Sequence, residues 1–316
     1  MKLSKVVSDY VTHKQALGMR YQAEAEMLAS FCRAQGDVEI QSVDPASVSA
    51  FIAGRGPLTR TWHGKYSVLA GLFRYAMARG YATSAPLPTT IPKLPPPFRA
   101  YIYSLDELKR LTSATATYNR IIAGRMLLGS TLRVMLLVMY GTGMRRGEVL
   151  SLVLEDVDLS LKLLTVRDTK FFKSRLVPIG PHLAAELDEY VRQRRCLPCT
   201  DGEKSSFFVT RRGKRIDDRC LNENFRKLCE LAGVRRESSA RYQPRIHDLR
   251  HTFAVHRLVA WYRAGADVQR MLPHLSTYLG HIKIAATQRY LSMTPELLSE
   301  ASRRFEDYVS KEVSHV

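Results

Sequence analysis

Helical spacing of apolar residues dominates residues 1–85 of the chain. Two early stretches show it: Leu3, Val6, Val7, Tyr10 and Val11, and then Met27, Leu28, Phe31 and Cys32. Asp44 followed by Pro45 is typical of a helix start, because aspartate caps the N-terminus and proline fits the first turn. A longer helix is predicted from Thr59 to Arg79, ending at Gly80. The first part of the chain is therefore predicted to be a small helical domain.

Residues 86–100 interrupt this pattern with a proline-rich run that holds neither a helix nor a central strand. We interpret the run as a stiff linker between a domain at 1–85 and a second domain that begins at residue 101.

The second domain opens with Ser104 and Glu107 at the spacing of a capping box, and helices lead to an apolar run from Val134 to Tyr140. Residues 163–167 and 174–179 are β-type runs joined by a short basic turn, as in a hairpin. Helical spacing returns after the second run. The pattern predicts a mainly α fold with one small antiparallel β-sheet.

Charge indicates the kind of partner. The 316 residues include 48 Lys and Arg against 30 Asp and Glu, a formal net charge of +18. The chain is basic on both sides of the linker, as expected for a partner rich in phosphate groups. A membrane partner is less consistent with the sequence, since the longest apolar run is too short to span a bilayer and the N-terminus lacks a signal-peptide block. We expect a soluble protein of the cytoplasm.

Five cysteines form an odd set, which argues against a secreted disulfide framework: Cys32, Cys196, Cys199, Cys220 and Cys229. Cys196 and Cys199 have the CxxC spacing of zinc and redox sites, but no second pair accompanies them. We expect reduced thiols, with this pair in a surface loop.

Two basic segments carry residue types suited to a phosphodiester. Arg145 follows a loop glycine and opens a helix with Thr142 available as its cap, so the guanidinium and the helix N-terminus both attract a phosphate. Arg146 points elsewhere, because helical neighbours do not share a face. Lys170, at the tip of the hairpin, can hand a proton to a departing sugar oxygen.

A third segment carries histidines. His247 and Arg250 stand three apart on a predicted helix, so both project from one face and can meet a single phosphate. His247 and His251 also have the spacing of the HExxH zinc motif, but an aspartate replaces its glutamate and Arg250 between the two ligands would repel a metal. We therefore favour a phosphate site without a metal. His281 follows in a turn, and Tyr290 lies nine positions later.

Other basic residues are candidates for contacts with DNA. Arg60, His63 and Lys65 lie on the polar face of the helix predicted at 59–79, although any surface helix has such residues. Lys173 and Arg175, beside the hairpin tip, are interpreted as contacts to backbone phosphates.

The chain resembles the tyrosine recombinases, also called the phage integrase family, over essentially its full length. The resemblance rests on the order and spacing of six residues: Arg145, Lys170, His247, Arg250, His281 and Tyr290. The hairpin sequence and the LeuGlyHis segment are similar to the branch carried by transposons and other mobile elements. One departure is the turn, where Phe171 and Phe172 stand in place of the glycines found in many relatives.

The resemblance implies a helical SAM-like core-binding domain at 1–85 and an α+β catalytic domain at 101–302. It also implies a C-terminal tail, 303–316, of the kind that relatives exchange between protomers. The implied partners are double-stranded DNA sites and further copies of the chain, a dimer on each site and a tetramer in synapsis, with sister recombinases or accessory proteins.

The resemblance assigns chemical roles. Tyr290 would attack the scissile phosphate and leave a 3′-phosphotyrosyl link, which a partner strand resolves through a Holliday junction. Arg145 and Arg250 would neutralise the non-bridging oxygens, and Lys170 would act as general acid.

The resemblance implies supporting roles for the histidines. His247 would assist proton transfer near Tyr290, His281 would hydrogen-bond a phosphate oxygen, and His251 is left with a structural role. No cofactor or metal is expected, because two arginines and a lysine supply the positive charge that metals supply elsewhere.

Two alternatives stay open. A type IB topoisomerase would use the same kind of site to relax DNA without exchanging strands. A catalytically silent, architectural DNA-binding protein would have lost at least one reactive residue, whereas all six positions are filled.

Overall fold

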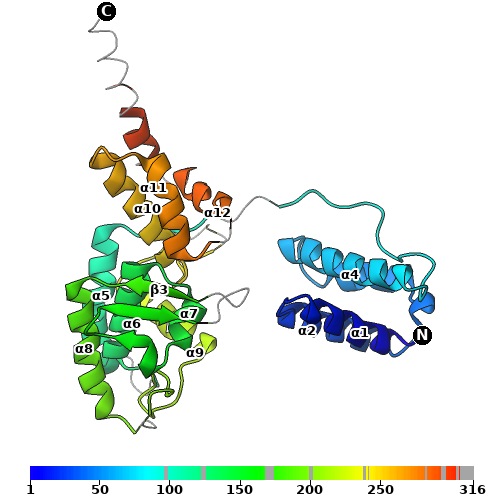
Figure 1. The fold of residues 1–316 in the computed structure, drawn as a ribbon, viewed down its shortest axis with the longest axis horizontal. Helices are drawn as coiled ribbons and strands as arrows, with labels where there is room; N and C mark the ends of the chain where they lie inside the picture. Colours follow the sequence, from blue (N-terminus) through cyan, green and yellow to red (C-terminus); the bar gives the residue numbers. More distant parts are fainter. Residues whose placement is uncertain are drawn as a thin grey trace, which may run out of the picture. The chain divides into compact units, whose positions relative to one another are not determined.

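The computed structural model divides the chain into two compact units, Met1–Phe98 and Arg99–Val316 (Figure 1). It describes all residues except 96–98, 122–125, 168–173, 199–201, 238–239, 241, 282, 293–296, 304–305 and 307–316. Within the described part, no helix is both long enough and apolar enough to cross a membrane.

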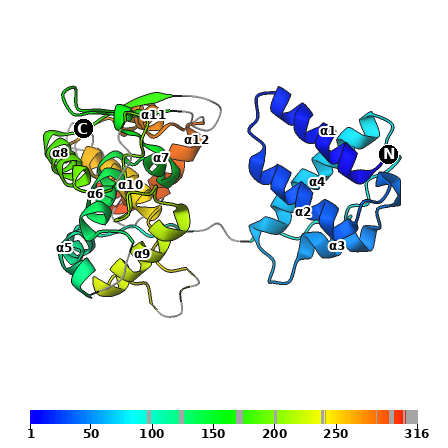
Figure 2. The same cartoon turned by 90° about the horizontal axis from the view of Figure 1, so that it is seen from below.

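The first unit is helical, as predicted (Figure 2). Its elements are α1 (Leu3–Ala16), α2 (Gln22–Gln35), the 3-10 helix η1 (Ile40–Ser42), α3 (Pro45–Ala53) and α4 (Arg60–Ala78). Helices α1, α2 and α3 each pack against α4. The core they enclose includes Leu28, Phe31, Leu69 and Phe73, none of which is exposed to solvent. The apolar spacing therefore identified the faces that pack.

Local caps explain where these helices begin. The Asp44 carboxylate accepts a hydrogen bond from the Ser47 backbone N–H at 2.8 Å, with Pro45 in the first turn of α3. Thr59 caps α4 by accepting from the Thr61 N–H at 3.3 Å. Both predicted helix starts are confirmed.

The second unit is also mainly helical, with one sheet. Its elements are α5 (Leu105–Ile121), α6 (Gly129–Thr142), α7 (Arg146–Ser151), η2 (Leu154–Asp156), β1 (Val157–Asp158), β2 (Leu163–Val166), β3 (Arg175–Pro178), α8 (Pro181–Arg195), α9 (Asp218–Leu231), α10 (Asp248–Arg263), α11 (Val268–Leu279), α12 (Ala285–Gln288) and η3 (Arg289–Ser292). Residues 297–303 are helical. The predicted capping box before α5 is present, since the Ser104 N–H donates to Glu107 and the Glu107 N–H donates to the Ser104 hydroxyl.

The sheet is antiparallel with the order β1-β2-β3. Strands β2 and β3 form the predicted hairpin, with Leu164 opposite Val177 and Thr165 opposite Leu176. Strand β1 was not predicted, because two residues are too short to show a period of two. The fold class, mainly α with a small antiparallel sheet, is confirmed.

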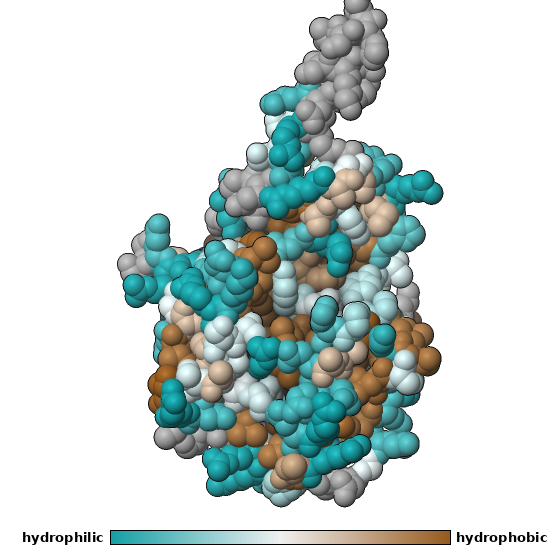
Figure 3. Space-filling view, turned by 90° about the vertical axis from the view of Figure 1, so that its left-hand side faces the viewer, coloured by the Kyte–Doolittle hydropathy of each residue, from teal (hydrophilic) through white to brown (hydrophobic). Residues whose placement is uncertain are grey.

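Helix α6 is the centre of the second unit. It packs against α5, α8 and α10, and most of its residues are buried. Gly129 permits the close approach to α5, because a Cβ atom there would lie 2.2 Å from the Thr115 carbonyl oxygen. The side of the unit that carries α5 and α8 has hydrophilic and apolar residues interspersed, and some of the apolar ones line a hollow near the middle of this face (Figure 3).

Candidate active site

The segment between α6 and α7 positions Arg145. Helix α6 ends at Thr142, Gly143 turns the chain in the left-handed region at φ +62°, and Arg145 becomes the N-cap residue of α7. The expectation that Thr142 caps this helix is wrong. Its hydroxyl donates to the Val138 carbonyl at 2.5 Å and accepts from the Met144 N–H at 3.2 Å, so it belongs to the end of α6.

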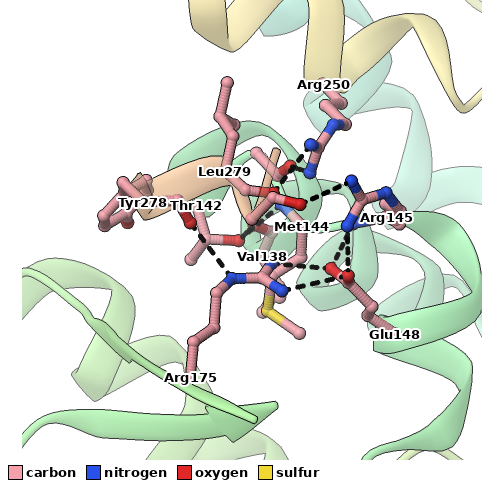
Figure 4. Close-up of polar contacts among 11 residues, drawn as sticks. Val138, Thr142, Met144, Arg145, Glu148, Arg175, Arg250, Tyr278 and Leu279 are labelled. Carbon is pink, nitrogen blue, oxygen red and sulfur yellow. Dashed lines mark hydrogen bonds and ion pairs between the residues drawn. The ribbon is translucent and has the colours of Figure 1, made fainter. Parts of the chain in front are cut away.

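Glu148 performs the capping role instead. Its carboxylate accepts from the Arg145 N–H at 2.9 Å and forms an ion pair with the Arg145 guanidinium at 2.7 Å (Figure 4). It also accepts two hydrogen bonds from Arg175, at 3.0 and 2.8 Å. Burial would raise the pKa of this carboxyl, but the hydrogen bonds and charges of Arg175 and Arg145 lower it to about 2. Glu148 is therefore a buried carboxylate held between two arginines.

Arg175 lies inside the unit. Its side chain is 14% exposed, and besides Glu148 it donates from Nε to the Tyr278 carbonyl at 3.1 Å. These contacts use three of the five guanidinium N–H donors. Gly280 makes room for it, because a Cβ atom there would lie 2.9 Å from Arg175 Nη1. Arg175 thus ties β3 to α7 and α11, and its contact with a backbone phosphate stays a prediction.

Arg250 is the most deeply buried of the predicted site residues, with 2% of its surface exposed. It donates to the Gly143 carbonyl at 2.6 Å and to the Leu279 carbonyl at 2.8 Å. Burial and the neighbouring Arg145 lower its pKa to about 10, so it stays protonated at neutral pH. Arg145 donates to the next carbonyl, that of Gly280, at 2.9 Å. The negative end of the α11 dipole thus holds both guanidinium groups beside each other.

We call Arg145, Glu148, Arg175 and Arg250 the arginine cluster. Beside it lies a second group, the tyrosine cluster, made of His247, His251, His281 and Tyr290.

Tyr290 is the centre of the tyrosine cluster. It lies in η3 and is 3% exposed. Its ring stacks on that of His281, with centroids 6.1 Å apart, and meets that of His251 at 5.6 Å. His281 is oriented by a 2.7 Å hydrogen bond between its Nδ1 and the Thr287 hydroxyl. His247 contacts the His251 ring edge-on at 5.3 Å.

The aspartate that follows His247 has a local structural task. Asp248 is fully buried, accepts from the Arg245 N–H at 3.0 Å and forms an ion pair with the Arg245 guanidinium at 2.9 Å. It fixes the turn that places His247 at the N-cap of α10.

The three histidines share an electrostatic environment. Burial, together with Arg250 and Arg245, lowers the pKa of His247 to about 4. Burial and the His247 ring do the same for His251, and burial with Arg250 and Arg145 for His281. All three rings are therefore neutral at pH 7, and each offers one donor and one acceptor nitrogen.

The structure brings five of the six predicted reactive residues into these two clusters; the sixth, Lys170, lies outside the described residues, as does Lys173. Glu148 was not predicted from the sequence. The spacing of Glu148 from Arg145, that of a capping box, was the available signal.

The candidates on α4 are in the first unit. Arg60 is exposed at the helix start. The Lys65 ammonium donates to the Phe51 carbonyl at 2.6 Å and lies over the Phe51 ring, 4.5 Å from its centroid, so it is tied to its own unit. His63 is half-buried against Trp62, and within the described part its Nε2 has no hydrogen-bond partner.

Comparisons with known proteins identify the family of the chain. Residues 104–296 match the model of the phage integrase family. The integrase/recombinase y4rB of Sinorhizobium fredii is 36% identical over 245 residues, covering 78% of each chain. The tyrosine recombinase XerC of Oceanobacillus iheyensis is 28% identical over 289 residues, 89% of this chain and 87% of that protein. The Tn1549 transposon integrase in complex with transposon right end DNA has a similar fold, with a TM-score of 0.68 at 15% identity over 97% of this chain and 99% of that one.

Proposed function

Because the chain belongs to the phage integrase family, and is a tyrosine site-specific recombinase like its named relatives, we propose that it cuts and rejoins DNA through a 3′-phosphotyrosyl link formed by Tyr290. One observation carries the proposal. The Tyr290 ring lies against two neutral imidazoles, next to a helix end whose carbonyls hold both Arg145 and Arg250.

The two arginines bind the scissile phosphate. Each guanidinium has five N–H donors, and the described contacts of Arg145 and Arg250 use two in each. The remaining donors are available to the non-bridging oxygens, whose charge must be stabilised as the phosphorus is attacked. Since Glu148 and the α11 carbonyls fix both side chains beforehand, binding DNA requires little reorganisation. The arginines also supply the positive charge that metal ions supply in other phosphoryl-transfer sites.

Proton transfers accompany the attack. The Tyr290 oxygen forms a bond to phosphorus as its proton passes to neutral His247, and His281 donates a hydrogen bond to a phosphate oxygen. The bond to the 5′-oxygen breaks, and Lys170 protonates that oxygen. The phosphotyrosyl link conserves the phosphodiester energy, so the 5′-hydroxyl of a partner strand attacks it, releases Tyr290 and passes the strands through a Holliday junction.

Strand exchange between two sites requires four active sites, which is why we propose a dimer on each DNA site and a tetramer in synapsis. The tail, 303–316, would dock on a neighbouring protomer. The hairpin motif supports integration, excision or transposition of a mobile element as the biological task.

Covalent capture tests the proposal. Duplex fragments covering the DNA that flanks the gene of this protein are nicked at random, incubated with the full chain and denatured. A nick near the scissile phosphate releases a short strand, so rejoining fails and the adduct accumulates. We expect linked DNA with the unaltered chain and none with Tyr290→Phe, which lacks only the phenolic oxygen.

Tyr262→Phe, on α10, is the matched control and should form the adduct normally. An equal yield from Tyr290→Phe would contradict the assigned nucleophile. Fragments that yield adduct are then placed in pairs on plasmids, where recombined products rather than relaxed plasmid alone are expected.

A further inference from the structure

His251 occupies an unexpected position for a residue assigned a structural role. It lies in the first turns of α10, and its ring contacts both the His247 ring, at 5.3 Å, and the Tyr290 ring, at 5.6 Å. Of the two histidines on this helix turn, His251 is thus the one whose ring contact with the nucleophile is described.

The hydrogen bonding of His251 is incomplete. Its Nδ1 is buried from solvent and has no hydrogen-bond partner among the described residues. An unpartnered buried nitrogen destabilises a fold, and proteins satisfy nearly all such atoms. The neighbouring His281 shows the usual arrangement, since Thr287 satisfies its Nδ1 at 2.7 Å. A polar atom left unsatisfied beside the nucleophile indicates a partner that arrives during the reaction.

The surroundings of His251 keep it neutral. Burial and the neighbouring His247 ring lower its pKa to about 4, with Asp248 favouring the charged form and Arg250 and Arg245 disfavouring it. A neutral imidazole can accept a hydrogen bond at Nδ1 when its Nε2 carries the proton. The phenol hydroxyl of Tyr290 is a donor that no other described side chain engages.

We propose that His251 is a positioning residue for the nucleophile: its Nδ1 accepts a hydrogen bond from the Tyr290 hydroxyl in the DNA-bound state and holds the phenolic oxygen in line with the scissile phosphate. The inference rests on the proposed function, because it concerns the same attack. The two rings are already direct neighbours, so a side-chain adjustment forms this bond without movement of either helix. The hydroxyl carries a single proton, which leaves the hydrogen bond to His251 and passes to His247 as the positioned oxygen attacks phosphorus.

Two substitutions that are isosteric with each other test the proposal. His251→Asn retains a polar atom close to the position of Nδ1, whereas His251→Leu introduces a side chain of the same shape as asparagine with no polar atom. The rate of adduct formation is measured for both variants in single turnover, on the DNA fragments that yield the covalent adduct with the unaltered chain. We expect His251→Leu to cleave at least about tenfold more slowly, as for the loss of one hydrogen bond to a group that becomes charged, and His251→Asn to recover most of that loss. DNA affinity should be unchanged in both.

A stability measurement separates positioning from packing. Since His251→Leu removes an unsatisfied buried nitrogen, its thermal unfolding midpoint should equal or exceed that of the unaltered chain while its cleavage falls. His182→Leu, on the exposed face of α8, is the control and should cleave normally.

The outcomes distinguish failure of the positioning role from failure of the proposed function. Equal cleavage rates for His251→Leu and the unaltered chain, or equal rates for His251→Asn and His251→Leu, would overturn the positioning role while leaving Tyr290 as nucleophile. Absence of any adduct with the unaltered chain would overturn the proposed function, and the positioning role with it.

Discussion

The arginine cluster and the tyrosine cluster lie next to each other but satisfy their polar groups differently. Each arginine of the arginine cluster makes at least two hydrogen bonds, to Glu148 or to backbone carbonyls. In the tyrosine cluster the described contacts are mainly between rings, and the bond from His281 to Thr287 is the only side-chain hydrogen bond to another described residue. The arginine cluster, proposed to bind the phosphate, is therefore fixed by its own contacts, whereas the tyrosine cluster, proposed to move protons, has few hydrogen bonds to other described residues.

Arg250→Lys should break the arginine cluster most severely. The charge is kept, but an ammonium has three N–H donors on one atom, so the Gly143 and Leu279 carbonyls would leave one for a phosphate where Arg250 has three in a planar fork. We expect the cleavage rate to fall by about 10² to 10³-fold, the cost of losing a fixed donor to a developing oxyanion. The rate is measured on the DNA fragments that yield the covalent adduct. Arg219→Lys, on the surface of α9, is the control and should cleave normally. A loss below about threefold would mean that charge alone matters.

Glu148→Ala should lower the free energy of unfolding by disrupting the arginine cluster. It leaves Arg175, which is 14% exposed, without its counter-charge. Removing one partner of a buried ion pair typically costs about 3 to 5 kcal/mol, and Glu148→Gln, which keeps an acceptor, should cost less. Urea denaturation measures the free energy of unfolding. Equal stability of Glu148→Ala and the unaltered chain would show that the buried pair contributes nothing.

As the pH falls, the free energy of unfolding should decrease first through the histidines of the tyrosine cluster and only later through Glu148 of the arginine cluster. The folded-state pKa of each histidine is about 4, below the unfolded value near 6.5, so the unfolded state binds more protons between these values. Stability should be complete above pH 6.5 and fall towards pH 4, by roughly 1.4 kcal/mol per pKa unit for a single histidine.

The Glu148 contribution follows at lower pH, since its pKa near 2 is depressed. Chemical denaturation at a series of pH values measures both decreases in the free energy of unfolding. His251→Leu should make the decrease between pH 6.5 and 4 less steep. An unchanged slope in that variant would show that His251 titrates normally in the folded state.

Gly280→Ala, between the two clusters, should produce the smallest loss in the free energy of unfolding. Both Gly280 and Gly265 have positive φ, +66° and +70°, but only at Gly280 would a Cβ atom meet a side chain, Arg175 at 2.9 Å. Gly265→Ala should cost about 1 kcal/mol for backbone strain alone. Gly280→Ala should cost about 1 kcal/mol more, because Arg175 must move. Equal losses in thermal unfolding would indicate that Arg175 shifts freely.

Local signals in the sequence were sufficient for much of the fold. The Asp44 and Thr59 caps and the Ser104 capping box depend on neighbours within three residues, so the sequence predicts them directly. The hairpin also follows from its alternation. Thr142 was misassigned because one hydroxyl can serve the end of one helix or the start of the next, and the turn at Gly143 decides between them.

The site was only partly predictable, for a physical reason. Motif order identifies Arg145, His247, Arg250, His281 and Tyr290, but not what holds them. The ion pair of Arg175 with Glu148 joins residues 27 apart, and the bond of Arg145 to Gly280 spans 135. Such contacts arise from tertiary packing, which periodicity and spacing do not contain. The unpartnered nitrogen of His251 is likewise visible only once burial is known.

The end of α11 has a consequence for how this protein can diversify. The consecutive residues Leu279, Gly280 and His281 hold Arg250, hold Arg145 and contact Tyr290, respectively. A substitution that displaces this tripeptide therefore disturbs the contacts of Arg250, Arg145 and Tyr290 at once. Variants that read new DNA sequences should accumulate their changes elsewhere, while this segment is inherited intact.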